Sequence, residues 1–87
     1  MNNGLPSSEI FDILEDSTGY LWFLTPYGVS RYDGYEFKNY TTHDGLTENS
    51  MVVGFLDRKG RPWFSGYNIG LSYFDQGEIK PYRFNDH

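Results

Sequence analysis

The chain has 87 residues, of which 20% are aromatic and 10 are glycine, and it carries a net charge of −5. This negative charge disfavours binding to nucleic acid or to an anionic membrane surface, since both attract basic proteins. The chain has no cysteine, so it offers neither a disulfide nor a thiolate metal ligand. We therefore expect one small domain of β-strands and tight turns, with no nucleic-acid partner and no membrane contact by this segment.

The first half of the sequence predicts four short strands separated by turn signals. We expect these strands at residues 9–15, 20–25, 28–32 and 35–40. Asp16 opens a turn that ends at Gly19, and Asp33-Gly34 is a hairpin signal before the fourth strand. Helix is disfavoured, because Gly or Pro recurs every few residues.

The second half repeats this pattern. Gly4-Leu5 recurs as Gly45-Leu46, an offset of 41 residues, and one extra residue near Ile69 makes the offset 42. The corresponding strands are expected at residues 50–56, 61–66, 70–74 and 78–82. A period of this length is typical of a four-stranded propeller blade. The sequence thus predicts an all-β fold of two β-propeller blades, residues 4–44 and 45–86, each a four-stranded antiparallel sheet. They form either a fragment of a larger propeller or a unit of an oligomeric one.

The linked motifs resemble the two-component regulator propeller repeat. The resemblance rests on GLPS at the start, DSTGYLWFLT in the first hairpin and GVSRYDG in the third strand, with weaker counterparts in the second half. The second copy departs at Gly66, where the first has Thr25, and at Tyr73, where the first has Arg31. The resemblance implies the opening blades of the extracytoplasmic sensor region of a Bacteroidetes-type hybrid histidine kinase, hence a periplasmic location and a carbohydrate-type ligand. The N-terminal residues show no signal peptide.

Several aromatic and acidic residues have both a functional and a structural interpretation. Trp22 and Trp63 could stack on sugars, but their identical position in both copies favours a role as buried wedges between blades. The aspartates could bind cations, but each stands at a glycine turn, which favours turn capping; they are Asp16, Asp33, Asp57 and Asp75. No metal-binding or catalytic motif is present, so we expect no metal, no cofactor and no enzymatic activity.

The candidate binding residues differ between the copies and belong to loops expected on one rim of the propeller. These ligand-binding candidates are Tyr27, Tyr67, Asn68, Asn49 and His43, with Ser8 and Asp44 beside them. Tyrosine rings and amide groups suit polyhydroxylated ligands, although solvated loop tips remain the simpler interpretation.

These observations leave two functional hypotheses open. The first is a ligand-binding sensor module that recognises a glycan. The second is a self-assembling structural propeller without a ligand of its own. Because blades pack on both faces, we expect the chain to contact neighbouring propeller blades or copies of itself, as a trimer or tetramer.

Overall fold

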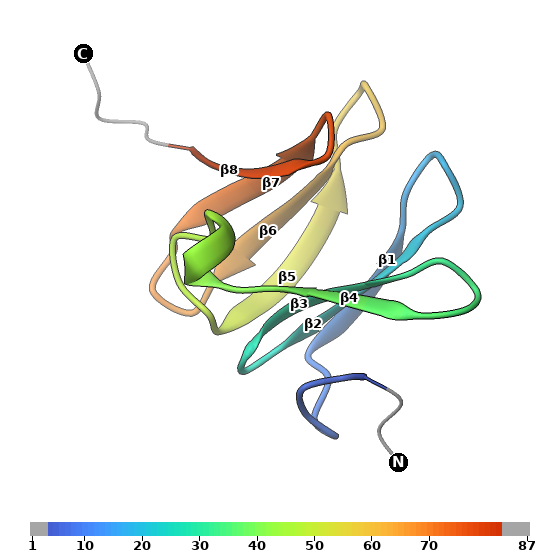
Figure 1. Ribbon diagram of the computed structural model, residues 1–87. Coiled ribbons are helices and arrows are strands. Elements are labelled where there is room, and N and C mark those ends of the chain that lie inside the picture. Colours follow the sequence, from blue (N-terminus) through green and yellow to red (C-terminus); the bar gives the residue numbers. More distant parts are fainter. Residues whose placement is uncertain (1–3, 83–87) are drawn as a thin grey trace.

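A computed structural model describes residues 4–82 as an all-β fold of two four-stranded antiparallel sheets (Figure 1). The strands are β1 (Asp12–Glu15), β2 (Leu21–Thr25), β3 (Gly28–Tyr32), β4 (Phe37–Tyr40), β5 (Met51–Leu56), β6 (Pro62–Gly66), β7 (Leu71–Asp75) and β8 (Glu78–Tyr82). A 3-10 turn, η1 (Thr42–Asp44), precedes β5. Each sheet has its strands in sequence order. The predicted fold class is confirmed. Within residues 4–82, no helix is long and apolar enough to cross a membrane.

Six of the eight strands begin later than the sequence predicts, and the largest shifts are in the first and the fourth. The first strand begins at Asp12 rather than at residue 9, although Phe11 N–H already donates to Leu24 O at 2.7 Å. The fourth begins at Phe37 rather than at residue 35, because the Asp33 carboxylate accepts the N–H groups of Tyr35 and Glu36 and draws them into the turn. The strands expected from residues 20, 50, 61 and 70 each begin one residue later.

Aspartate side chains organise the hairpins that lead into β2 and β6. Asp16 Oδ1 accepts the N–H groups of Thr18 and Tyr20 at 2.9 and 3.1 Å, and Asp57 Oδ1 does the same for Lys59 and Arg61. The capping role expected from the sequence is therefore present at both aspartates, whereas the Asp75 carboxylate lies 3.7 Å from Arg61 Nη1 and 3.6 Å from Lys80 Nζ. Asp16 and Asp57 each also accept the indole N–H of the tryptophan six residues later, a bond that the sequence analysis did not foresee.

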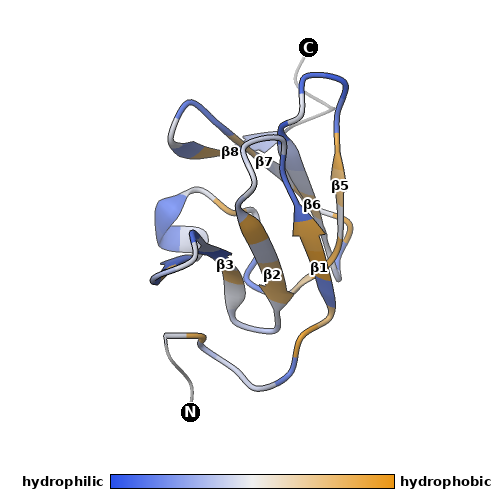
Figure 2. Ribbon diagram, turned by 90° about the vertical axis from the view of Figure 1, so that its right-hand side faces the viewer, coloured by the Kyte–Doolittle hydropathy of each residue, from blue (hydrophilic) through white to orange (hydrophobic). Residues whose placement is uncertain are grey.

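The core lies between the two sheets. Trp22 is fully buried, and its ring centroid lies 5.2 Å from that of Phe64 and 4.8 Å from that of Phe74. Strand β5 packs against both β1 and β2, and all three strands contain apolar segments (orange in Figure 2). A side chain at Gly54 would collide with Leu14, so this glycine permits the close approach of the sheets.

The second tryptophan has a different environment. Trp63 is only half-buried, because it lies on the face of β5–β8 that points away from the first sheet. It packs between Phe55, Tyr73 and Tyr82 of its own sheet. The expectation of a buried wedge therefore holds fully for Trp22, whereas Trp63 has no second sheet over it among the described residues.

Candidate functional site

Three connections lie along one edge of the molecule and form the predicted rim. They are the β2–β3 turn, the β6–β7 loop and the β4–β5 connection with η1 (Figure 1). Tyr67 N–H donates to Ser50 O at 3.0 Å and joins the second of these to the third. The hairpin turns that Asp16 and Asp57 organise lie at the opposite edge. These three connections together form the rim.

The two strand-joining loops of the rim are built in different ways. In the first, Thr25 Oγ1 donates to Gly28 O at 2.9 Å and accepts Tyr27 N–H at 3.0 Å. In the second, Gly66 stands in place of Thr25. The Glu48 carboxylate instead accepts the N–H groups of Asn68 and Gly70, at 3.0 and 3.1 Å. The second copy thus lacks the threonine hydroxyl at residue 66, and the Glu48 carboxylate from the β4–β5 connection supplies the hydrogen-bond acceptor in its place.

Glu48 is a site residue that the sequence analysis missed. A Cβ added at Gly66 would occupy the position of the Glu48 carboxylate, so the two positions depend on each other. The signal in the sequence is a paired change, since Ser7 and Thr25 of the first copy become Glu48 and Gly66 in the second.

The two predicted asparagines turn their side chains toward the protein itself. Asn49 Oδ1 accepts Thr42 N–H at 2.9 Å, which ties the β4–β5 connection to η1. Asn68 Nδ2 donates to Glu48 Oε1 at 3.3 Å. These amides therefore help to hold the rim loops in shape.

The two predicted tyrosines present their rings to solvent. Tyr27 is 62% exposed and Tyr67 is 78% exposed. Ile69, 77% exposed, lies beside Tyr67 in the same loop and was not predicted as a site residue. Ile69 has φ of 62°, a left-handed conformation that is strained for a β-branched side chain. The rim therefore carries three exposed apolar side chains on loops that are fixed at their bases.

His43 is exposed on η1, and this turn is internally fixed. Thr41 N–H donates to Asp44 Oδ2 at 2.8 Å, and His43 N–H donates to Thr41 Oγ1 at 3.2 Å, which together form a capping box. Asp44 thus serves the backbone, whereas the His43 ring faces solvent beside it. Ser8 is exposed in the segment before β1.

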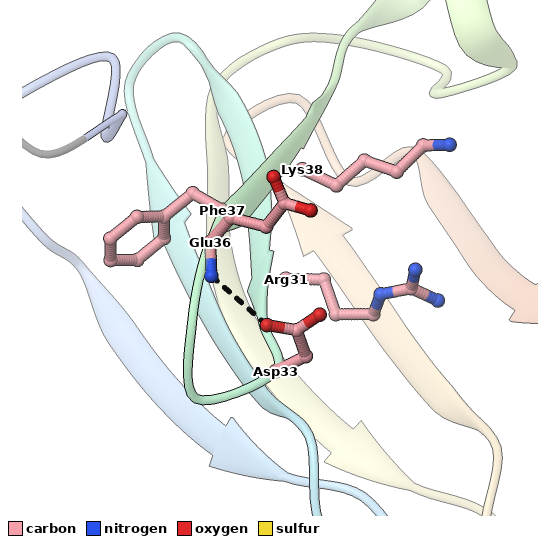
Figure 3. Close-up of a pocket in the computed structure, with 5 residues that line it drawn as sticks. All are labelled: Arg31, Asp33, Glu36, Phe37 and Lys38. Atoms are coloured by element: carbon pink, nitrogen blue, oxygen red, sulfur yellow. Dashed lines mark hydrogen bonds between the residues drawn. The ribbon is translucent and has the colours of Figure 1, made fainter.

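A separate hollow lies on the β3–β4 hairpin, away from the rim (Figure 3). Arg31 and Lys38 point to one side of this hairpin, and Phe37 points to the other. Hydrogen bonds from the N–H groups of Glu36 and Tyr35 lower the pKa of Asp33 below its ordinary value. Residues 4–82 contain no group of three His, Cys, Asp or Glu side chains that could hold a metal ion.

Comparison with known proteins agrees with this architecture. Residues 4–27 match the family model of the two component regulator propeller, a segment that runs from the start of the described chain through β1, β2 and their following turn. No curated protein matches the chain. The match supports a propeller repeat in the first sheet, and the second sheet repeats its strand order and turns.

Proposed function

We propose that this chain is a non-catalytic ligand-binding module of a two-component sensor, located in the periplasm, and that its rim binds a carbohydrate-type ligand. The observation that carries the proposal is the placement of Tyr27 and Tyr67, whose rings are exposed on loops of neighbouring blades along one edge. The match to the two component regulator propeller supports the sensor context. The proposal assigns no catalytic group, because the rim offers no nucleophile held against a base.

The chemistry of the rim suits a neutral glycan. An aromatic ring offers a flat apolar surface to the C–H face of a sugar, and its hydroxyl can bond to a sugar hydroxyl. The His43 ring supplies a further polar group. Because Glu48 and Asn49 fix the loops before any ligand arrives, binding would require little loss of loop entropy.

Binding can be tested by calorimetry against a panel of neutral oligosaccharides. We expect at least one ligand to bind, and we expect Tyr27→Ala and Tyr67→Ala each to weaken that binding by about tenfold or more. Tyr35→Ala is the matched control, because Tyr35 is 92% exposed but lies in the β3–β4 turn. Equal losses in all three variants, or no binding of the unmodified chain, would refute the proposed rim. Turnover of any panel member would refute the non-catalytic assignment.

A further inference from the structure

Two apolar faces of the molecule have no sheet packed on them within residues 4–82. The Trp63 face is the side of β5–β8 turned away from the first sheet, and it includes Val53, Phe55, Trp63, Tyr73 and Tyr82, with Ser65 and Lys80 beside them. The Phe23 face is the side of β1–β4 turned away from the second sheet, and it includes Ile13, Phe23, Tyr32 and Phe37, with Ser30 and Asn39 beside them. Ile13, Val53 and Phe55 are 53%, 51% and 45% exposed. Apolar surface gathered in this way marks an interaction site.

The buried contact between the two blades indicates which surface each exposed face can pack against. There, Trp22 of the first blade packs on Phe64 and Phe74 of the second. In the sequence repeat the counterpart of Trp22 is Trp63, so the Trp63 face corresponds to the side of the first blade that is buried. The counterparts of Phe64 and Phe74 are Phe23 and Tyr32, both on the Phe23 face.

The correspondence extends to the edge of the Phe23 face. Ile79, buried in the existing interface, has Phe37 as its counterpart, and the Phe37 ring lies 4.6 Å from that of Tyr32. Gly45 lies against the backbone carbonyl of Ile79, and its counterpart Gly4 lies against the side chain of Phe37. The receiving surface, with the chain segment that borders it, is therefore already formed in the first blade.

Both blades contain an arginine stacked on a tyrosine ring, but the arginine and the tyrosine have exchanged their positions in the repeat. In the first blade, the Arg31 guanidinium lies 4.6 Å from the Tyr20 ring centroid and 5.3 Å from that of Phe74 in the other blade. In the second blade, Arg61 stands in place of Tyr20 and Tyr73 in place of Arg31, and they lie 5.1 Å apart. The Trp63 face thus keeps both the tryptophan and the cation–ring pair of the buried surface.

We propose that a second copy of this chain docks its Phe23 face on the Trp63 face of the first, with Trp63 against Phe23 and Tyr32. This contact is head-to-tail, so a pair of copies still presents one Phe23 face and one Trp63 face to further copies. Closure after three or four copies gives six or eight blades, within the range of about four to eight that propellers adopt. The surface is separate from the rim, so this inference does not depend on the proposed ligand.

The existing interface also identifies a pair of residues that should meet across the contact. Asp12 Oδ2 accepts Gly54 N–H at 2.9 Å between the blades. The counterpart of Asp12 is Val53 and that of Gly54 is Ile13, so Val53 of one copy should face Ile13 of the next. Both side chains are about half exposed in the single chain, which means that polar substitutions there should leave the monomer folded.

Sedimentation equilibrium of the 87-residue chain at micromolar concentration tests the proposal. We expect the mass of three or four copies for the unmodified chain and of one copy for Val53→Glu and for Ile13→Lys. The double variant Val53→Glu/Ile13→Lys should regain the assembly, because opposite charges then meet at the contact. Val53→Glu/Ile13→Glu should stay monomeric, and Tyr35→Lys, in an exposed turn, should assemble normally. A monomeric unmodified chain with a cooperative melt would overturn the proposal, as would a double variant of opposite charge that stays monomeric while folded.

Discussion

Trp22 and Trp63 occupy the same position in two copies of one sequence pattern, and their local geometry is nearly identical. Each donates its indole N–H to the aspartate six residues earlier at 2.8 Å. Trp22 is nevertheless fully buried, whereas Trp63 is half-buried. The difference arises because a second sheet covers Trp22 but not Trp63 within the described residues. The hydrogen bond of each tryptophan is thus a property of its own hairpin, whereas the full burial of the ring comes from the neighbouring blade.

Removing each tryptophan ring in turn should have the largest effect on stability. Trp22→Ala should lower the free energy of unfolding by about 3–5 kcal/mol, a large share of the stability of a small domain. Trp63→Ala should lower the free energy of unfolding by less than half of that amount, because less of its ring surface is withdrawn from solvent. This variant is measured in a monomeric background such as Ile13→Lys. Urea melts followed by circular dichroism would measure both values. Equal losses in the two variants would show that burial by the neighbouring sheet adds little.

The rim loops permit a second test of how far the two blades are interchangeable. Gly66→Thr places a Cβ where the Glu48 carboxylate lies, and we expect it to lower the free energy of unfolding by about 1–3 kcal/mol, since the loop N–H groups lose their acceptor. The double variant Gly66→Thr/Glu48→Ser recreates the side chains of the first blade and should recover part of that loss. Thermal melts of the two variants decide the outcome. A double variant less stable than Gly66→Thr alone would contradict the proposed compensation.

The aspartate of the second hairpin gives a prediction on pH. Partial desolvation acts to raise the pKa of Asp57, but hydrogen bonds from Trp63, Arg61 and Lys59 outweigh it and hold this pKa well below the ordinary 3.8. A folded-state pKa below the unfolded one contributes stability above about pH 3.8, and this contribution is lost as the pH falls further. Asp57→Asn should therefore melt at a lower temperature than the unmodified chain at neutral pH. The difference should shrink in acid, and a difference independent of pH would contradict the assignment.

The smallest expected effect concerns the extra residue of the second blade. Ile69 has a left-handed backbone conformation, which is unfavourable for a β-branched residue. Ile69→Asn should raise the free energy of unfolding by about 1 kcal/mol, because asparagine tolerates this conformation. Ile69→Val keeps the branch at Cβ and is the matched control, with no gain expected. Denaturant melts of both variants would show whether strain sets the difference.

The rim shows where prediction from sequence succeeded and where it could not reach. The exposed Tyr27 and Tyr67 lie where the repeat pattern predicted them, because turn residues between strands project from the sheet edge. Asn49 and Asn68 were predicted as ligand contacts, yet their amides bind the protein's own Thr42 and Glu48. Their partners come from other segments of the chain, and no local pattern encodes such pairings.

Local sequence patterns account for the two copies, the eight strands of the described chain and the aspartate turns. These features follow from backbone preferences and short-range hydrogen bonds, which depend on residues close in the chain. Long-range packing sets which tryptophan is covered: within residues 4–82 a second sheet covers Trp22 but not Trp63. It also brings Glu48 to the β6–β7 loop, where it takes the part that Thr25 has in the β2–β3 turn. Burial and side-chain pairing depend on which distant segments meet, and that is settled only when the two sheets pack together.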